Sequence, residues 1–449
     1  MGYYCSCAYT IAIVAVTSLQ LTASVVSAGG FQIFEVGVKG QGVAHAGMAS
    51  RADGPETVYF NPAGMVYLST SQVSFGLTKH FVKADFSGRA EYSPAAGPLS
   101  GLTFENSMKG SNGGDPLSLP ATGIYAVYSF SDDAKFGLGI NTPFGLISEY
   151  DKGWAGRYLA LKSSLKTINI NPSFAIRVNE KLALAVGFNA AYADAELTQA
   201  IDLGLLLAPL GETPGALAND GSTKVSGKDW GFGGNLGIIF EPVPGTRIGI
   251  GYRSPQKLNI DGRVRFGTGR FSPALFGPVL ESGRATAPLT LPQWASVSLY
   301  HAINSQWAAM FDATWTDWSV IEELRIRFPG NPPRPDTVLP TKWKDSWRFA
   351  LGSVYKPSAT WTLRTGIAHE KTPTPDPRHY TPRVPAGDGV SLAIGASYLW
   401  NRNWAVDAAY THIFIDALPI NRTEGAHRLA GHYSGSVDII GLQLNYTFN

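Results

Sequence analysis

Cysteine is nearly absent from this sequence. The two cysteines, Cys5 and Cys7, both lie within residues 1–28, an uncharged segment that contains the apolar run TIAIVAV and ends in small residues. This pattern predicts a secretory signal peptide over 1–28, with an uncleaved anchor helix as the alternative. Once the signal is removed the chain has no thiol, which excludes disulfides, thiolate catalysis and cysteine-based metal sites.

Charge and long apolar runs are also scarce. Charged residues make up 16% of the chain and the formal net charge is +2, so the sequence lacks the basic excess of a nucleic-acid-binding protein. After residue 28 no run of 18 uncharged apolar residues occurs, and no transmembrane helix is predicted. Instead the chain contains 50 glycines and 12% aromatic residues, a composition that favours β-structure with many tight turns.

Catalytic motifs are missing as well. The chain has no G-x-S-x-G, H-E-x-x-H or Walker sequence, and GVKGQGVAHAG departs from the dinucleotide fingerprint because His45 stands at the third glycine position. His427 and His432 are close in sequence, but without cysteines or clustered acids they are a weak metal signal. We therefore predict that the protein is not an enzyme and holds no metal or cofactor, although dispersed catalytic residues would escape a motif search.

The dominant pattern is an alternation of apolar and polar residues with period two. It is clearest near the C-terminus, where Ile440, Leu442, Leu444, Tyr446 and Phe448 alternate with glycine and polar residues. Several such segments exceed ten residues and end in Trp or Tyr. Strands of this length with aromatic ends are typical of tilted outer-membrane strands, whereas strands of soluble β-sandwiches and propellers, the alternatives, are usually shorter.

The connections between these segments alternate in length. Six are tight: 131–134, 179–181, 243–246, 304–306, 357–360 and 401–403. Seven are longer and rich in Pro and Gly: 93–120, 143–164, 198–226, 267–284, 329–341, 371–388 and 416–432. Short periplasmic turns that alternate with long outer loops are the topology of an outer-membrane barrel, and this count predicts an all-β, 14-stranded antiparallel transmembrane β-barrel.

A lumen of this width has to be either water-filled or plugged. Residues 29–68 precede the first strand, lack alternation and are long enough to form a plug, so we expect a hatch over 29–68 and the barrel over 69–449; a disordered tail is the alternative. The segment ETVYFNPAGM closes this region. Pro62 fixes one backbone angle, Asn61 can bond its own backbone and Gly64 permits special angles, which together predict a turn before a first strand near Ser71.

Two of the expected outer loops are unusually apolar. IDLGLLLAPLG (201–211) and FSPALFGPVL (271–280) either mark a binding surface or pack only on each other. Basic residues, in turn, fall on the inward parity of several strands, where they either hold an anionic head group or pair with inward acids such as Asp312 and Glu323; these residues are Arg247, Arg253, Arg325, Arg327, Lys344, Arg348 and Arg364. An apolar entrance and a basic interior suit an amphipathic acid.

A set of segments in consistent order, from Gly29 to the C-terminus, resembles the FadL family of outer-membrane transporters for long-chain fatty acids and related hydrophobic compounds. The segments are GGFQ, NPAG, NTPFGLISEYDKGWAGRYLA, AVGFNAAYADAEL, WTDWSVIEELRI, WKDSWRFALG and WTLRTGIAHEKTPTPD. The resemblance implies a fourteen-stranded barrel plugged by an N-terminal hatch in the cell outer membrane of a Gram-negative bacterium.

The resemblance also implies a route and assigns residues to it. Ligand enters a groove between outer loops, moves to a tighter internal site near basic residues, and leaves sideways when the hatch shifts beside a kinked third strand. In this sequence the hatch residues are Phe31, Asn61, Pro62, Ala63 and Gly64; the groove is Leu203, Leu205, Leu206, Leu207, Leu275 and Phe276; the head-group residues are Lys344 and Arg348; the lateral opening is Asn141, Thr142, Pro143 and Gly145.

One departure from the family weakens the assignment of an acidic ligand. A second basic head-group position of the fatty-acid members falls near the end of AAYADAELTQA, where this chain has Glu196, Thr198 and Gln199. Three functions therefore stay open: passive uptake of fatty acids, uptake of neutral or aromatic hydrocarbons, and a water-filled porin or adhesin. The expected partners are a hydrophobic small molecule and outer-membrane lipid, without nucleic acid, and we expect a monomer.

Overall fold

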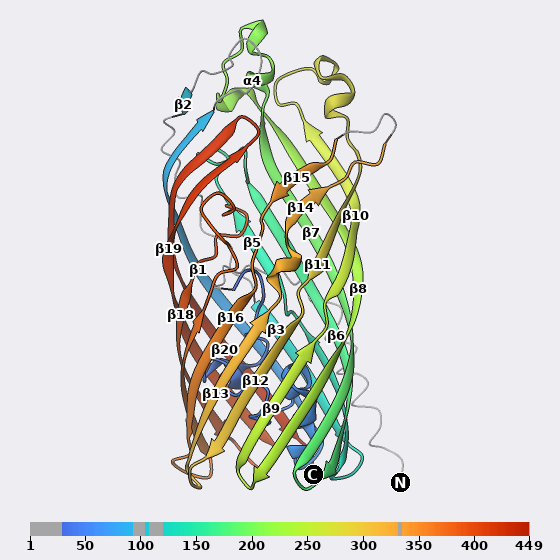
Figure 1. Ribbon diagram of the computed structural model, residues 1–449, viewed down its shortest axis with the longest axis vertical. Coiled ribbons are helices and arrows are strands. Elements are labelled where there is room, and N and C mark those ends of the chain that lie inside the picture. Colours follow the sequence, from blue (N-terminus) through green and yellow to red (C-terminus); the bar gives the residue numbers. More distant parts are fainter. Residues whose placement is uncertain (1–28, 93–103, 107–119, 331–334, 449) are drawn as a thin grey trace.

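The computed structural model describes residues 29–92, 104–106, 120–330 and 335–448. The predicted signal peptide over 1–28 lies outside these residues. The protein is a tall, closed β-barrel whose lower half contains a folded N-terminal segment, while the long connections gather at the opposite end (Figure 1). No helix among the described residues is long and apolar enough to cross a membrane.

Fourteen antiparallel strands form the wall, three of them built from two consecutive segments. In chain order the segments are β1 (Gln72–Tyr92), β3 (Pro120–Ser129), β4 (Ala134–Asn141) with β5 (Gly145–Glu149), β6 (Lys162–Asn179), β7 (Leu182–Asp202), β8 (Asp220–Val243), β9 (Thr246–Arg253) with β10 (Gln256–Gly267), β11 (Gly283–Leu291) with β12 (Trp294–Ala302), β13 (Trp307–Thr316), β16 (Ser346–Tyr355), β17 (Trp361–Glu370), β18 (Gly389–Leu399), β19 (Trp404–Glu424) and β20 (His427–Thr447). Both the strand count and the plugged barrel predicted from the sequence are confirmed.

The barrel closes between its first and last strands. β1 pairs with β20 over its whole length, from Gln72 opposite Thr447 to Tyr92 opposite His427, and its lower part also pairs with β3. Closure leaves no free wall edge along β1, where a free edge would invite pairing with other chains. A short strand, β2 (Phe104–Asn106), pairs with the outer end of β1.

The period-two pattern places apolar residues on the outside of the wall. On β20 the side chains of Ile440, Leu442 and Leu444 are exposed, whereas Gln443 and Asn445 between them are buried against the interior. An exterior of this kind is stable in lipid, because the strands satisfy every backbone polar group and the outer side chains are apolar. The sequence pattern thus determined which face meets the membrane.

All six tight turns expected from the sequence lie between consecutive wall strands. The prediction of a long loop over 416–432 is wrong. Residues 416–432 continue β19 and β20 beyond the membrane as a hairpin that turns at Gly425, where φ is +60°. Pro419 suggested a loop, yet the pairing of β19 with β20 shifts by a bulge between Ile415 and Leu418 and accommodates it. A bulge at this point lets a proline lie in a strand without a broken ladder.

The connection expected at 329–341 is also partly regular. Beyond β13, the chain forms η6 (Trp318–Val320) and then a separate hairpin of β14 (Glu323–Ile326) and β15 (Thr337–Pro340). This hairpin reaches the wall through the pair Thr286 and Arg327, which exchange two backbone hydrogen bonds of 2.9 and 2.8 Å. The other outer loops contain α4 (Leu203–Leu206), η2 (Ala208–Leu210), η3 (Leu217–Asn219), η4 (Pro273–Leu275) and η5 (Gly277–Leu280).

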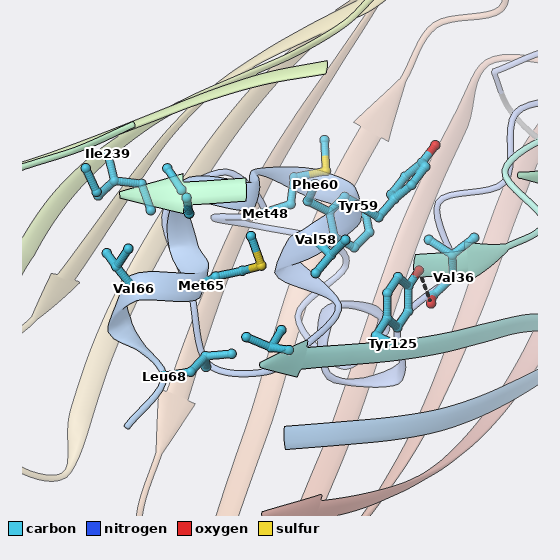
Figure 2. Close-up of a cluster of buried hydrophobic side chains, with 14 of the residues drawn as sticks. Val36, Met48, Val58, Tyr59, Phe60, Met65, Val66, Leu68, Tyr125 and Ile239 are labelled. Atoms are coloured by element: carbon cyan, nitrogen blue, oxygen red, sulfur yellow. Dashed lines mark hydrogen bonds between the residues drawn. The ribbon is translucent and has the colours of Figure 1, made fainter. Parts of the chain in front are cut away.

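Residues 29–68 fold inside the barrel, with short helical turns at α2 (Val38–Gln41), α3 (Thr57–Phe60) and η1 (Pro62–Tyr67). Figure 2 shows the apolar cluster that joins this hatch to the wall: Met48, Val58, Phe60 and Met65 of the hatch pack near Tyr125 and Ile239 of the wall. Wall glycines permit the close approach. A Cβ at Gly237 would lie 2.0 Å from Oδ1 of Asn61.

Candidate functional site

Three adjoining cavities lead from the outer mouth toward the hatch. The outer cavity has a volume of about 550 Å³, the middle one about 320 Å³ and the inner one about 150 Å³. Leu339 of the β14–β15 hairpin lines all three, and Leu197 and Val225 line the middle and inner cavities. The hairpin therefore lies where the three cavities adjoin.

The inner cavity is lined mainly by apolar side chains. They come from the hatch, the wall and the outer loops, and include Phe31, Leu146, Leu165, Ile260, Leu289, Ile321 and Trp343. At its floor, Phe31 packs edge-on against Trp318 with ring centroids 4.9 Å apart. An apolar cavity closed below by a hatch residue suits a hydrocarbon chain or ring, because the apolar surfaces of the ligand and of the cavity lining are both removed from water on binding.

Two arginines provide the positive charge of the inner cavity. Arg383, in the loop between β17 and β18, is 6% exposed and also borders the middle cavity. One of its terminal nitrogens donates to Oε1 of Gln199 at 2.5 Å and the other to Oγ of Ser163 at 3.3 Å, while Nε has no hydrogen-bond partner. Within the described structure Arg383 has no carboxylate partner within 4.0 Å, so it can bind an anion.

Arg422 is the second arginine, and it borders the outer and the inner cavity. It forms an ion pair with Glu424 and donates a hydrogen bond of 3.0 Å to the carbonyl oxygen of Pro340 in the hairpin. Glu424 thus neutralises Arg422 through a direct ion pair, whereas Arg383, which also lies in the field of Glu424, has no direct ion pair in the described structure.

The loop that carries Arg383 is anchored beside the interrupted third wall strand. Oγ of Ser148 on β5 donates to the carbonyl oxygen of Arg383 at 3.0 Å, and the hydroxyl of Tyr150 donates to that of Pro382 at 2.6 Å. Ring stacking of Tyr150 on Trp154, with centroids 4.0 Å apart, supports the same region. The guanidinium is held at the cavity by contacts that no local sequence pattern could predict.

The structure does not bring the head-group residues expected from the resemblance to these cavities. Lys344 is exposed, and its backbone nitrogen donates to the carbonyl oxygen of Pro373 at 2.9 Å. Arg348 is buried against the hatch, where it donates to the carbonyl oxygen of Ala44 at 2.6 Å and lies over the ring of Phe34. Neither residue lines any of the three cavities.

The expected groove residues divide into two groups. Leu203 and Leu207 are buried within their own loop, whereas Leu206 and Leu275 are more than half exposed. The outer cavity reaches Leu205 and Leu206, but the three cavities do not include Leu275 or Phe276. The two loops therefore present an apolar rim, with Leu206 at the outer cavity and Leu275 outside the three cavities, rather than a single closed groove.

The expected lateral opening coincides with a break in the wall. β4 ends at Asn141 and β5 begins at Gly145, and the hatch fills the gap: the backbone nitrogen of Ile33 donates to Pro143 at 2.8 Å and that of Gly145 donates to Phe31 at 3.0 Å. Thr142 takes part too, since its Oγ1 accepts from the backbone nitrogen of Thr122 at 3.2 Å. The N-terminal end of the hatch thus replaces a wall strand at this position.

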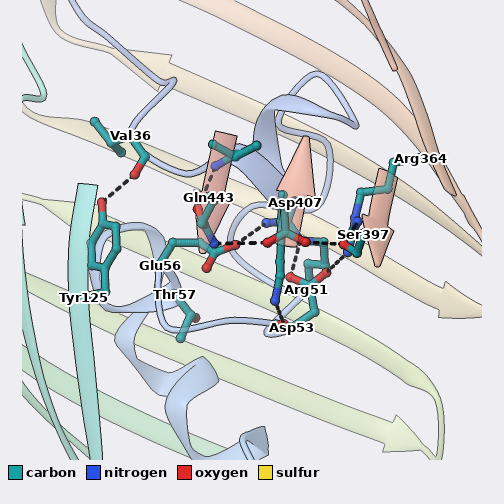
Figure 3. A network of polar contacts seen from close by, with 12 residues as sticks. Val36, Arg51, Asp53, Glu56, Thr57, Tyr125, Arg364, Ser397, Asp407 and Gln443 are labelled. Carbon is teal, nitrogen blue, oxygen red and sulfur yellow. Dashed lines mark hydrogen bonds and ion pairs between the residues drawn. The ribbon is translucent and has the colours of Figure 1, made fainter. Parts of the chain in front are cut away.

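A buried network of charges holds the hatch against the last strands (Figure 3). Arg51 and Arg364 both approach the carboxylate of Asp53, at 2.6 and 3.5 Å, and Arg364 continues through Ser397 to Asp407. Burial alone would raise the pKa of Asp53, but the charges of Arg51, Arg364 and Lys39 outweigh it and hold that pKa well below its usual range. Burial, with Asp53 nearby, raises the pKa of Glu56. Such a network fixes the position of the hatch as long as all its partners stay together.

Asn61 of the NPAG turn is fully buried, and its side chain forms three hydrogen bonds. Its Oδ1 accepts from the backbone nitrogen of Ala63 at 3.1 Å, which starts η1, and its Nδ2 donates to the carbonyl oxygens of Ala49 at 2.6 Å and of Ile238 in the wall at 2.9 Å. Gly64 is required by close packing, because a Cβ there would lie 2.1 Å from Oγ1 of Thr57. The sequence identified the turn; the link to the wall appears only in the fold.

Replacement of Asn61 is expected to loosen the hatch without preventing barrel assembly. Asn61→Ala removes the two buried hydrogen bonds to Ala49 and Ile238, each of which contributes about 0.5 to 1.5 kcal/mol. We expect unchanged far-ultraviolet circular dichroism and a raised ion conductance in planar bilayers. Asn61→Asp keeps the acceptor for Ala63 but turns a carboxylate oxygen toward the carbonyl oxygens of Ala49 and Ile238, so it should loosen the hatch at least as much as the alanine variant. Loss of the folded barrel in both variants would instead assign Asn61 to assembly.

The fold and the cavities define a class of protein. A closed barrel with an apolar exterior, an internal hatch and an apolar cavity behind it is an outer-membrane transporter for hydrophobic compounds. The family profile described as "Outer membrane protein transport protein (OMPP1/FadL/TodX)" matches residues 19–448. The chain therefore belongs to the FadL/TodX family, whose members are non-enzymatic transporters of the Gram-negative outer membrane, as the sequence predicted.

Individual relatives agree with this assignment. The chain is 31% identical to the "Long-chain fatty acid transport protein" of Escherichia coli O157:H7 over 93% of this chain and 94% of that protein. It is 30% identical to the "47 kDa outer membrane protein" of Pasteurella multocida over 96% and 97% of the two chains. Among solved structures, a Pseudomonas aeruginosa FadL homologue has a TM-score of 0.83 at 24% identity, covering 94% of this chain and all of that one, and the Ralstonia pickettii toluene transporter TbuX has a TM-score of 0.66 at 21% identity, covering 93% and 100%.

Among the described residues no group of three or more His, Cys, Asp or Glu side chains is arranged to hold a metal ion. His427 instead stacks on Tyr158 with ring centroids 4.2 Å apart, while His432 lies farther along β20. In the part of the chain that the structure describes, neither histidine belongs to such a group.

Proposed function

We propose that the protein takes up long-chain fatty acids, or similar amphipathic acids, across the outer membrane. The observation that carries the proposal is Arg383, a buried guanidinium without a carboxylate partner in the described structure, at an apolar cavity. A carboxylate can accept its donors while the hydrocarbon tail occupies the apolar space below. The relatives named for fatty-acid transport support the same ligand class.

The absence of a basic residue at the end of β7 is offset by tertiary structure. Gln199 stands near the position where the resemblance places a cation, and Arg383, 184 residues away, donates to its side chain. Positive charge therefore reaches this part of the cavity from another loop. This contact favours an acidic ligand over the neutral hydrocarbons that the sequence left open.

The route that we propose has three stages. Ligand collects on the apolar rim around Leu206 and Leu275, moves through the outer and middle cavities, and binds in the inner cavity with its carboxylate at Arg383. Movement of Phe31 to Ile33 then opens the break between β4 and β5, and the ligand leaves sideways into the membrane. The process is passive, driven by binding and by dilution into lipid.

Transport of neutral or aromatic hydrocarbons is the second candidate. Two observations favour it: the inner cavity is otherwise apolar, and Arg422 is already paired with Glu424. A pocket of this kind binds neutral hydrocarbons through apolar contact alone.

Mass spectrometry of the ligands that copurify with the protein, together with competition between oleate and the neutral alkene of the same length, tests the proposal. Fatty acids should copurify, and oleate should displace them at lower concentration than the alkene does. Equal displacement by both ligands would favour the hydrocarbon transporter.

A further inference from the structure

The outer surface of the barrel carries a cluster of cations that the transport route does not use. It spans β8, β10 and β11 and consists of Lys224, Lys228, Lys257, Arg263, Arg265 and Arg284. Their strand neighbours Leu258, Ile260 and Val264 are buried on the inner side, so the alternation of the strands directs the cations outward. The cluster therefore faces the surroundings of the barrel rather than its lumen.

Two cross-strand pairs in this cluster have the same charge. Arg263 on β10 lies directly opposite Arg284 on β11, and Arg265 lies directly opposite Lys224 on β8. Side chains that face each other in an antiparallel pair are about 5 Å apart, and like charges at that separation destabilise the sheet. One member of each pair has an acidic partner, Asp261 for Arg284 and Glu196 for Lys224, which offsets only part of this repulsion. An anion between the pairs would remove the rest.

The acids nearby neutralise only part of the cluster. Asp261 pairs with Arg284 at 2.6 Å, Glu196 pairs with Lys224 at 2.6 Å, and Asp194 pairs with Lys228 at 3.6 Å. Within the described residues Arg263 and Arg265 have no ion pair. Two arginines thus remain exposed and available, each able to bind a phosphate through two parallel hydrogen bonds.

The height of the cluster above the membrane identifies its partner. Trp230 and Tyr192, with ring centroids 5.3 Å apart, mark the outer end of the apolar exterior. Arg263 lies opposite Ser226, four residues farther out than Trp230, and Arg265 lies opposite Lys224, six residues farther out. At about 3.3 Å per residue and a strand tilt of about 40°, these arginines stand roughly 10 to 15 Å above the aromatic level. This is the layer of phosphorylated lipid head groups, not the hydrocarbon core.

We propose that Arg263 and Arg265, with Lys224 and Arg284, bind the phosphates of lipopolysaccharide in the outer leaflet. A phosphate group placed between the like-charged pairs removes their repulsion, so the lipid stabilises the barrel wall next to the cavities. The interaction is electrostatic and exposed, and it weakens as the salt concentration rises. The site does not depend on the transported ligand.

The test compares thermal unfolding in two kinds of vesicle. Purified protein is placed in phosphatidylcholine vesicles without or with bisphosphorylated lipid A, and unfolding is followed by circular dichroism. In phosphatidylcholine alone, the double variant Arg263→Ser and Arg265→Ser should unfold at a higher temperature than the unaltered protein, because repulsion is removed. With lipid A the order should reverse, and native mass spectrometry should count fewer bound lipid A molecules on the variant.

Two controls make the result specific. The variant Lys79→Ser and Lys83→Ser removes two exposed cations from β1 that face no like charge: Ile440 and Ser436 lie opposite them on β20, and the acid Asp438 lies between those two residues. This variant should show no reversal. Lipid A without phosphates should not distinguish the cluster variant from the unaltered protein. An unchanged response of the Arg263 and Arg265 variant to lipid A, or an equal loss in the β1 variant, would overturn the proposal.

Discussion

Arg383→Met is expected to weaken oleate binding by about 10- to 100-fold while leaving the affinity for a neutral alkene of the same length nearly unchanged. The methionine keeps apolar bulk at the cavity but removes the donors of a charge-assisted hydrogen bond, which contributes about 1.5 to 3 kcal/mol. Titration of the purified protein with each ligand, followed by tryptophan fluorescence, measures both affinities. Trp318 and Trp343 lie around Phe31 and report on the inner cavity.

Two further variants sharpen this experiment. Lys344→Ala removes the cation that the family resemblance assigns to the head group, and because Lys344 is exposed away from the cavities it should bind oleate normally. Arg383→Lys keeps the positive charge but loses the planar guanidinium. Its affinity for oleate should lie between that of Lys344→Ala and that of Arg383→Met. A larger loss for Lys344→Ala than for Arg383→Met would return the head-group role to Lys344. Equal losses for oleate and the alkene would limit Arg383 to shaping the cavity.

A disulfide between residues 32 and 144 is expected to stop uptake while leaving ligand binding intact. Gln32 and Phe144 form an isolated antiparallel bridge, and the flanking hydrogen bonds, from Ile33 to Pro143 and from Gly145 to Phe31, make it a non-hydrogen-bonded pair. The Cα atoms of such a pair are about 4.5 Å apart, within the range that a disulfide spans. In Gln32→Cys with Phe144→Cys, oxidation would fix the hatch in the wall opening.

Uptake of labelled oleate by cells that carry this double variant measures the effect. Under oxidising conditions uptake should fall to the level of cells without the protein, and reduction should restore it. The pair Leu77→Cys with Leu442→Cys links β1 to β20 on the lipid-facing side, and it should transport normally in both states. The predicted mature chain has no other cysteine that could interfere. Full uptake by the oxidised 32–144 variant would show that ligand leaves by another path.

Features that depend on neighbouring residues could be predicted from the sequence. Alternation identified the wall strands, and Asn61, Pro62 and Gly64 identified the turn that begins η1. The family resemblance placed a kink at Pro143, and the break between β4 and β5 lies there; proline suits such a break because it cannot donate to a strand ladder. Local rules failed at Pro419, where a bulge keeps the chain in β19, since a bulge depends on the partner strand.

The binding residues could be predicted only in part. Lys344 has the inward parity expected of a lumen residue, but the chain there leaves the wall before β16 and the side chain is exposed. Arg383 lies in a loop sequence without periodicity, and nothing in PRVPAGD indicates that its side chain is buried. The position of Arg383 is set by the contacts of Ser148 and Tyr150 with the backbone of that loop, which are visible only in the folded protein.

The family resemblance indicated the position of the interrupted strand. The sequence pattern by itself determined the barrel, its apolar exterior and the turn at Asn61 to Gly64. These follow from period-two alternation and turn chemistry, which act over a few residues. Only the tertiary structure decided which cations face the cavities and which face the hatch or the membrane surface. That choice depends on contacts such as Arg383 with Gln199, 184 residues apart, which barrel closure and loop packing bring together.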